Sequence, residues 1–266
     1  MKARRDVTAR LTYLSPESGA PAYYSGEPGQ EERSTGQYSQ IPIEISDARA
    51  LPRAPELDVE GFCLIKHGTQ DVDFNSDDDV TTNYYPQIVS LLKQQLGADE
   101  VIVFDHNVRL DAKQAGIRRP ARHVHSDYTV RSAIRRMLDL VDEKEAVGRL
   151  RHRFGQVNLW RPLKYQVSTS PLALADARSV KQEDYVKVDI IYPDRKGEIL
   201  EVIHKPSHRW FYFPDMTPSE ALIFKGFDSD PKSGYLRTPH SAFEDPTSPR
   251  GAKPRLSIEL RAMVFF

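Results

Sequence analysis

The spacing of apolar residues changes near residue 155, and this change divides the chain into two kinds of structure. Before it, two segments carry apolar residues at helical intervals. One begins at the acidic run 77–79 and ends at Gly97, and the other covers 130–141 with a stripe that includes Val130 and Leu138. After it, apolar and polar residues alternate, which is typical of strands. Seven strands are predicted there, over 156–160, 186–192, 198–204, 208–213, 220–226, 236–243 and 255–265.

The part before residue 110 predicts fewer strands and one long connection. Strands are expected over 7–14, 61–66 and 101–104. Residues 15–40 are rich in Ser, Gly, Pro, Glu and Tyr, so they predict a long loop. Such a loop is either disordered or a flexible lid that closes over a site with its tyrosines, Tyr23, Tyr24 and Tyr38.

Several short strands preceded by helices indicate a mainly β protein with flanking helices. The expected core is a β-barrel or a double-sheet, cupin-like jelly roll, and residues 41–150 are expected to contribute a helical buttress. All-β domains of 266 residues are often undivided, so residues 1–266 are expected to form a single domain.

Charge and hydropathy argue against several classes of function. The chain has 37 Lys and Arg against 38 Asp and Glu, so its net charge of -1 gives no electrostatic reason to bind nucleic acid or an anionic membrane. The sequence has no apolar run of about 18 residues, the length that a membrane span requires. The N-terminal charges are followed by no apolar stretch, unlike those of a secretory signal, so a cytoplasmic location is expected.

Cysteine usage agrees with that location. Cys63 is the single cysteine of the chain, so an internal disulfide is excluded and a reducing compartment is expected. It lies in the apolar sequence Gly-Phe-Cys-Leu-Ile, which predicts a buried, unreactive thiol rather than a nucleophile.

Two histidines and a carboxylate give the first indication of chemistry. His125 and Asp127 are two residues apart, and on a strand such residues point to the same face, about 6–7 Å apart. With His240 they form the two-histidine, one-carboxylate set that holds Fe(II) and leaves three positions open. His123 with His125 is an alternative ligand pair, but a carboxylate is a harder ligand and suits Fe(II) better. The residues therefore indicate a non-haem iron oxygenase.

The C-terminal strand carries the second indication. Its even positions are apolar, whereas its odd positions are mostly polar: Arg255, Ser257, Glu259 and Arg261. Periodicity alone favours an outer strand with its polar face in water. The order of the motifs favours the opposite arrangement, in which Arg255 and Ser257 lie inside and grip a carboxylate of a co-substrate. Arg250 and Arg261 are alternative anchors.

Several motifs together resemble one known family. Along the chain they are Gly61-Phe62, Lys66-His67, Tyr84-Tyr85-Pro86, Val103-Phe-Asp-His106, His125-Ser-Asp-Tyr-Thr129, Asn158-Leu-Trp-Arg-Pro162, Pro171-Leu-Ala-Leu-Ala-Asp-Ala-Arg-Ser-Val180, His208-Arg-Trp-Phe-Tyr-Phe-Pro-Asp-Met216, Glu220-Ala-Leu-Ile-Phe-Lys225, Phe227-Asp-Ser229, His240-Ser-Ala-Phe243 and Pro254-Arg-Leu-Ser-Ile-Glu-Leu-Arg261. This combination resembles the CmcJ/NvfI-type, or gibberellin-desaturase-like, family of secondary-metabolism oxygenases from fungi and bacteria. The resemblance covers the chain from about residue 41 to its end.

The resemblance implies a double-stranded β-helix fold, with Fe(II), 2-oxoglutarate and O2. By position, His125, Asp127 and His240 match the iron ligands, and Arg255 with Ser257 matches the 2-oxoglutarate anchor. It implies oxidation of an unactivated C–H of a small natural-product or amino-acid-derived substrate. Hydroxylation, desaturation, cyclisation and endoperoxidation all occur in the family, and the sequence does not select among them.

Two further sets of residues are co-facial on predicted strands. Asn158 and Trp160 either line the co-substrate or substrate pocket or pack in the core. His208, Trp210 and Tyr212 are expected to form a packed wall of the barrel.

Two other classes of protein stay open. One is an iron oxidase that uses no 2-oxoglutarate, in which Arg255 grips a carboxylate of the substrate. The other is a non-catalytic accessory protein of a biosynthetic partner enzyme, against which the intact set of metal-type residues argues. A small-molecule substrate is the expected partner, and a homodimer is compatible with the sequence.

Overall fold

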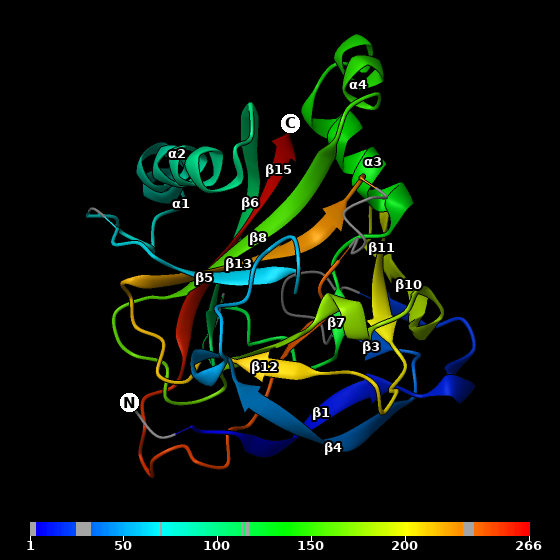
Figure 1. The fold of residues 1–266 in the computed structure, drawn as a ribbon. Helices are drawn as coiled ribbons and strands as arrows, with labels where there is room; N and C mark the ends of the chain where they lie inside the picture. Colours follow the sequence, from blue (N-terminus) through cyan, green and yellow to red (C-terminus); the bar gives the residue numbers. More distant parts are fainter. Residues whose placement is uncertain (1–3, 25–32, 70, 113, 115–116, 231–236) are drawn as a thin grey trace.

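The structure, a computed structural model, describes residues 4–24, 33–69, 71–112, 114, 117–230 and 237–266. Within them it is mainly β, with two sheets and few helices (Figure 1). The larger sheet has ten strands, in the spatial order β1 (Val7–Leu14), β4 (Tyr38–Asp47), β12 (Trp210–Tyr212), β9 (Leu172–Ala175), β14 (His240–Ala242), β7 (His125–Ser126), β11 (Lys196–Val202), β10 (Tyr185–Ile191), β2 (Ala22–Tyr24) and β3 (Arg33–Ser34). The smaller has five, in the order β5 (Phe62–Lys66), β13 (Glu220–Asp228), β8 (Phe154–Pro162), β15 (Leu256–Phe265) and β6 (Glu100–Leu110).

Alternate residues of the central strands face two different cores. Leu174 of β9 packs with Phe224 of the smaller sheet, in the space between the sheets. Its neighbour Ala173 points the other way and packs with Leu11 of β1. The larger sheet therefore curls, so that β1 and β4 cover its outer side while its inner side faces the smaller sheet.

One helical run covers the outer face of the smaller sheet (Figure 1). It consists of α1 (Asp77–Asp79), the π-helical η3 (Val80–Tyr84) and α2 (Tyr85–Leu96), and it ends at Gly97 with a φ of +63°. Ile88 and Leu92 pack with Leu260 of β15. This confirms the predicted helix and its glycine stop. No described helix combines the length and the apolar character needed to cross a membrane.

A second pair of helices, α3 (Val130–Leu140) and α4 (Glu143–Arg149), packs on one end of the interior. Ala133 and Met137 are fully buried against Phe154 and other residues of the smaller sheet. The predicted helix over 130–141 is confirmed, but its predicted apolar stripe is too wide. Val130 and Leu138 are 50% and 48% exposed, because the helix is buried along the narrower line of Ala133 and Met137.

The prediction that residues 15–40 form one long loop is wrong on both sides of residues 25–32. It contains the 3-10 turn η1 (Pro16–Ser18), then β2, which pairs with β10, and β3, which pairs with β2; β4 begins at Tyr38. Short strands that depend on edge pairing carry little periodic signal, which explains the error. Tyr38 stacks on His123, with ring centroids 4.1 Å apart, and so forms part of a wall. Residues 25–32, where the tip of the predicted lid would be, lie outside the described residues.

The helix α4 and the strands β4 and β9 were not predicted either. The sequence of β9, Leu-Ala-Leu-Ala, is buried on both faces and therefore shows no alternation of polar and apolar residues. The other predicted strands are present, and several of them, such as β6, are longer than predicted.

The predicted wall of His208, Trp210 and Tyr212 is confirmed, since all three are buried. The Trp210 Nε1–H donates to the Tyr13 hydroxyl at 2.7 Å. That hydroxyl lies 3.4 Å from His208 Nδ1, and His208 Nε2 lies 3.1 Å from Asp184 Oδ2. Burial lowers the pKa of His208 although Asp184 opposes the shift, so the neutral ring donates to Asp184 and accepts from Tyr13. Tyr13 thus joins β1 to β12 inside the protein.

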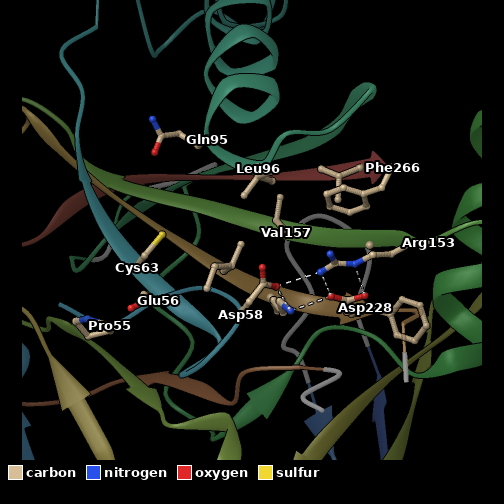
Figure 2. Close-up of a pocket in the computed structure, with 15 residues that line it drawn as sticks. Pro55, Glu56, Asp58, Cys63, Gln95, Leu96, Arg153, Val157, Asp228 and Phe266 are labelled. Carbon is tan, nitrogen blue, oxygen red and sulfur yellow. Dashed lines mark hydrogen bonds and ion pairs between the residues drawn. The ribbon is translucent and has the colours of Figure 1, made fainter. Parts of the chain in front are cut away.

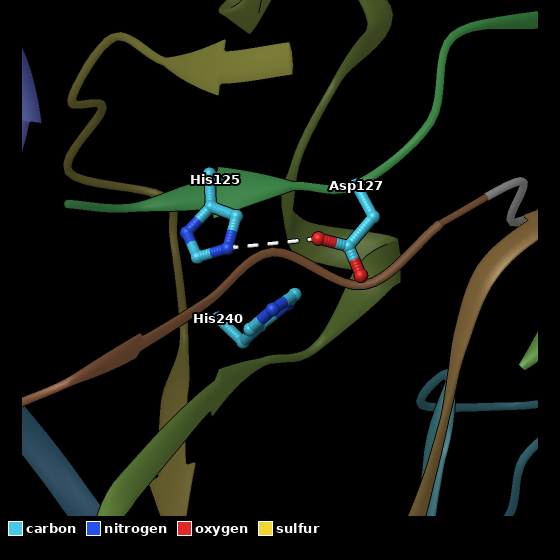
Figure 3. A group of neighbouring side chains, drawn as sticks. All are labelled: His125, Asp127 and His240. Atoms are coloured by element: carbon cyan, nitrogen blue, oxygen red, sulfur yellow. Dashed lines mark ion pairs between the residues drawn. The ribbon is translucent and has the colours of Figure 1, made fainter. Parts of the chain in front are cut away.

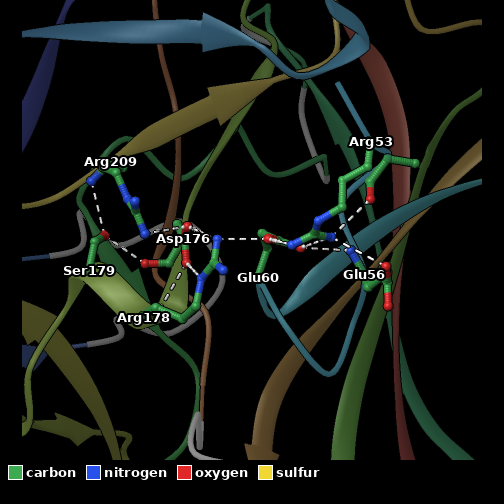
Figure 4. A network of polar contacts seen from close by, with 8 residues as sticks. Arg53, Glu56, Glu60, Asp176, Arg178, Ser179 and Arg209 are labelled. Carbon is green, nitrogen blue, oxygen red and sulfur yellow. Dashed lines mark hydrogen bonds and ion pairs between the residues drawn. The ribbon is translucent and has the colours of Figure 1, made fainter. Parts of the chain in front are cut away.

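A network of charges joins the segment before β5 to the turn after β9 (Figure 4). Glu60 pairs with Arg53 and Arg178, and Asp176 pairs with Arg178 and Arg209. Both carboxylates are buried, so the arginines compensate charges that water does not reach. The network ties a connection of the smaller sheet to the larger one.

We expect Tyr13→Phe to lower the free energy of unfolding by about 1–3 kcal/mol, because the buried Trp210 N–H and His208 Nδ1 lose their shared partner. Urea denaturation measures this free energy. Tyr24→Phe is the matched control, since Tyr24 is 39% exposed and its loss of a hydroxyl should change stability by less than about 0.5 kcal/mol. Equal effects of the two substitutions would contradict the role assigned to Tyr13.

Candidate metal centre

His125, Asp127 and His240 come together between the two sheets (Figure 3). β14 pairs with β7 so that His240 lies directly opposite His125. The two ring centroids are 4.4 Å apart, and His125 Nε2 is 3.7 Å from Asp127 Oδ1. One ligand atom from each of the three residues lies within 4.8 Å of the others. The three residues that the sequence predicted as metal ligands therefore form one cluster.

Backbone carbonyls decide which nitrogen of each ring is free. The His125 Nδ1–H donates to the His123 carbonyl at 2.7 Å, and the His240 Nδ1–H donates to the Thr238 carbonyl at 3.1 Å. With Nδ1 protonated, Nε2 of each ring offers its lone pair. Burial, together with the nearby His240, lowers the pKa of His125 to about 4, and burial lowers that of His240. Both rings are therefore neutral, as a metal ligand requires, near pH 7.

The Asp127 carboxylate is held ionised and oriented. Burial alone would raise its pKa, but Arg261 and the histidines hold the pKa well below the usual range. The Asn158 Nδ2–H donates to Oδ2 at 2.6 Å, and Oδ1 is directed toward His125. The sequence placed Asn158 near the site but did not identify it as the partner of this carboxylate, because that contact depends on how β8 lies against β7.

Two of the three candidate anchor arginines are already paired or lie outside. Arg250 is exposed in the connection before β15. Arg261 lies at the metal end of β15, where its Nη2 is 2.7 Å from Asp105 Oδ2 and its charge acts on Asp127. Neither arrangement leaves a buried guanidinium for a co-substrate.

Arg255, immediately before β15, is a buried cation with no carboxylate partner among the described residues. It is 2% exposed, its Nη1 donates to the Ser170 carbonyl at 2.6 Å, and its guanidinium lies 5.4 Å from the centre of a Trp160 ring. Its Nε is buried without a hydrogen-bond partner, as is the hydroxyl of Ser257. Burial, with Arg109 next in effect, lowers the pKa of Arg255 to about 9.

The polar face of β15 is inside the protein. Arg255, Ser257 and Glu259 are buried between the sheets, whereas Ile258 and Leu260 on the other face pack beneath α2. The order of the motifs predicted this arrangement, and the outer-strand alternative is wrong. Burial raises the pKa of Glu259, and the charge of Asp127 raises it further. Glu259 was not predicted as a site residue, although it lies on the same polar face of the strand as Ser257, which could have indicated it.

A pocket of about 290 Å³ lies away from this centre, on the outer side of the smaller sheet (Figure 2). Lys225 and Arg153 pair there with Asp58 and Asp228. Cys63 also lines it, partly buried and free of disulfides, and burial raises the pKa of its thiol to about 11. The thiol is therefore protonated at neutral pH, as predicted for an unreactive cysteine. The four charges pair with one another and give no indication of chemistry.

A second, smaller pocket of about 150 Å³ reaches Asp127 from the surface. It lies between α3 and the hairpin of β10 and β11, and its lining includes Tyr128, Tyr192 and Arg261. Of the three clustered residues, Asp127 alone lines this pocket.

Comparison with known proteins agrees with this geometry. A protein-family model described as an oxidoreductase/YMDC permease-like domain matches residues 11–265. The hydroxylase/desaturase efuI of Hormonema carpetanum is 33% identical over 257 residues, covering 86% of this chain and 85% of that protein. The Fe(II)/2-oxoglutarate-dependent dioxygenase nvfI of Aspergillus novofumigatus is 29% identical over 269 residues, covering 97% and 96%.

A solved structure gives the same result for the fold. The iron and alpha-ketoglutarate-dependent endoperoxidase NvfI matches with a TM-score of 0.87 and 27% identity, covering 98% of each chain. The match extends over both sheets and the centre between them. The chain therefore belongs to the matched oxidoreductase family, the Fe(II)/2-oxoglutarate-dependent oxygenases of fungal secondary metabolism that include NvfI.

Proposed function

We propose that this chain uses Fe(II) and 2-oxoglutarate to oxidise an unactivated C–H bond of a small natural-product or amino-acid-derived substrate. Two facing sheets with the metal residues between them support a double-stranded β-helix, or jelly-roll, core. The α-helices of the described residues all lie within 41–150, which supports their role as a buttress of one oxygenase domain over 1–266. The observation that carries the proposal is Arg255, a buried cation with no carboxylate partner among the described residues, in the interior that contains the metal residues.

His125, Asp127 and His240 fit Fe(II). Two neutral imidazole nitrogens and one carboxylate oxygen within 4.8 Å of one another are the donor set that leaves adjacent coordination positions open. The backbone carbonyls at the two rings, and Asn158 at the carboxylate, orient these ligands before a metal binds. When bound, Fe(II) with 2-oxoglutarate and O2 supplies the oxidising chemistry, and the protein supplies binding, orientation and exclusion of water.

Arg255 and Ser257 fit the distal carboxylate of 2-oxoglutarate. A buried guanidinium is stable only when its charge is compensated, and the described part of the chain offers it no carboxylate. The Arg255 Nε–H and the Ser257 hydroxyl are buried donors without partners. A planar carboxylate accepts from such a pair in a forked geometry. Trp160 supports one face of the guanidinium and so lines the co-substrate end of the site.

The pocket that reaches Asp127 is the proposed entrance for the primary substrate. Tyr128, Tyr192 and Ile199 give it apolar surface among charged side chains such as Arg135 and Lys196, so it suits a small molecule that carries polar groups beside an apolar part. Arg261 borders it but is engaged with Asp105. The 2-oxoglutarate anchor is at the opposite end of β15, so the two small molecules approach the metal from different sides.

We expect the metal-free protein to bind Fe(II) and, on anaerobic addition of 2-oxoglutarate, to develop the weak visible band of the chelate. His240→Ala should abolish iron binding, because one protein ligand is lost, while circular dichroism still shows a folded protein. His152→Ala is the control, since His152 is exposed. Stoichiometric iron on His240→Ala would sink the metal assignment. Iron without the band in the unmodified protein would favour an oxidase that uses no 2-oxoglutarate.

We expect Arg255→Ala to weaken 2-oxoglutarate binding by about 10-fold to 100-fold, because hydrogen bonds to charged groups contribute about 1.5–3 kcal/mol. Titration of the chelate band measures the affinity. Arg250→Ala is the matched control and should leave the affinity unchanged, since Arg250 is exposed. The anchor would have to be reassigned if both substitutions weakened binding equally, or if neither did.

We expect Asn158→Leu to weaken Fe(II) binding by about 10-fold to 100-fold, as loss of a partner that orients a metal ligand commonly does. Gln156→Met is the matched control: Gln156 is buried on the same strand and face, and its side-chain amide has no hydrogen-bond partner in the described part of the chain. Equilibrium titration with Fe(II) measures both. The role of Asn158 as a partner of Asp127 is refuted if the two variants bind Fe(II) equally well.

A further inference from the structure

A backbone outlier lies next to Arg255. Ser170 has a φ of +46°, in the left-handed region that residues other than glycine rarely adopt, and it precedes Pro171, whose ring further restricts the residue before it. Ser170 is 4% exposed, so solvent does not relieve the strain. Such conformations persist only where surrounding contacts determine them, and they gather at functional sites.

Two charged side chains hold the Ser170 hydroxyl. The hydroxyl donates to Asp111 Oδ2, and the Arg122 Nη2–H donates to the hydroxyl at 2.8 Å. Arg122 also donates to both oxygens of Asp111, at 3.3 and 3.2 Å. Burial alone would raise the pKa of Asp111, but the hydroxyl and Arg122 hold it below the usual value, so the carboxylate is ionised. Two charge-assisted hydrogen bonds, one accepted and one donated, therefore fix the Ser170 side chain.

The same contacts connect Ser170 to Arg255. The Ser170 carbonyl accepts from Arg255 Nη1 at 2.6 Å, and the Asp111 backbone N–H donates to the Arg255 carbonyl at 2.9 Å. Asp111 thus holds both the strand that carries the guanidinium and the residue that orients it.

The group that accepts from Arg255 is a backbone carbonyl and not a carboxylate. A carbonyl orients a guanidinium without neutralising it, whereas a carboxylate in the same place would compete with an incoming anion. The carboxylate of Asp111 is instead engaged by the Ser170 hydroxyl and Arg122, and only its charge is felt at Arg255. The arrangement leaves Arg255 rigid and still cationic.

We propose that Ser170, held by Asp111 and Arg122, is a positioning residue for 2-oxoglutarate. Its left-handed backbone directs a carbonyl that fixes the Arg255 fork in the orientation that receives the distal carboxylate. This rests on the proposed anchoring role of Arg255, through which Ser170 acts. Because the rotamers of Arg255 are restricted before the ligand arrives, less entropy is lost on binding.

The test compares 2-oxoglutarate with pyruvate, which has the same 2-oxo acid group but no distal carboxylate, in anaerobic titrations of the Fe(II)-loaded full chain. Ser170→Ala keeps the side-chain carbon but removes the hydroxyl link. It should weaken 2-oxoglutarate binding about fivefold to tenfold and leave the affinities for pyruvate and Fe(II) unchanged. Ser170→Gly, which accommodates the positive φ, should show the same loss and serves if the alanine variant does not fold.

Thr169→Ala is the matched control. Its hydroxyl donates to the Lys253 carbonyl at 3.1 Å, so it joins the same two loops without reaching Arg255. This substitution should change neither affinity. In an Arg255→Ala background, Ser170→Ala should have no further effect on 2-oxoglutarate, because the two residues act as a unit.

The outcomes separate this proposal from the proposed function. If Arg255→Ala leaves the 2-oxoglutarate affinity intact, the anchor itself is wrong. If Arg255→Ala weakens binding but both Ser170 variants do not, the anchor stands and the positioning role is overturned. Equal weakening of 2-oxoglutarate and pyruvate in the Ser170 variants also overturns it, since that pattern reports a general distortion of the site.

Discussion

The burial of the polar face of β15 is the constraint on which the rest of the site depends. This strand places arginines and a glutamate between two sheets, where an uncompensated charge is costly. At the metal end, Arg261 meets Asp105 and acts on Asp127, which keeps that carboxylate ionised and ready to bind a cation. Just before the strand, Arg255 contacts a backbone carbonyl and the face of Trp160, and the described residues offer it no carboxylate partner. The strand can accept this arrangement because its opposite face, with Ile258 and Leu260, is fully buried beneath α2 and contributes apolar burial.

The metal residues depend equally on long-range pairing. β7 has two residues and β14 has three, so neither is stable by itself. β14 is held between β9 and β7, and β7 is held between β14 and β11, and these pairings place His240 opposite His125. Because each ring is also fixed by a carbonyl two residues before it in the chain, the backbone that forms the sheet also sets the tautomers. The strand pairing that forms the sheet therefore also sets the geometry of the three residues. A change in register would disrupt both the sheet and this geometry.

The sequence predicted features that depend on the pattern within one segment. It did not predict features that depend on how separate segments pack together. The alternation of β15 and the spacing of His125 and Asp127 follow from the period of a strand, so the core of the site was predictable. β9 was not, since burial on both faces removes its alternation. The partner of Asn158 depends on how β8 meets β7, which no single segment specifies. Nothing in a serine before a proline distinguishes the left-handed Ser170 from an ordinary loop residue. The resemblance to a family supplied the co-substrate, which residue patterns alone did not name.

In the proposed function, Arg261 of β15 and Arg255 just before it let one segment of the chain serve two ligands. Tyr128, Asp105 and Asp127 outweigh burial at Arg261 and raise its pKa, and its ion pair with Asp105 already compensates its charge. Burial and Arg109 lower the pKa of Arg255 to about 9, so its protonated form is less stable here than in water, although it remains protonated at neutral pH. The free protein bears that cost, and an anion that pairs with Arg255 removes it. A monocarboxylate bound through its 2-oxo acid group has no second charge with which to do so. With Arg255 in its proposed role, selectivity for a dicarboxylate would follow from a charge that has no carboxylate partner in the described part of the chain, more than from any additional contact.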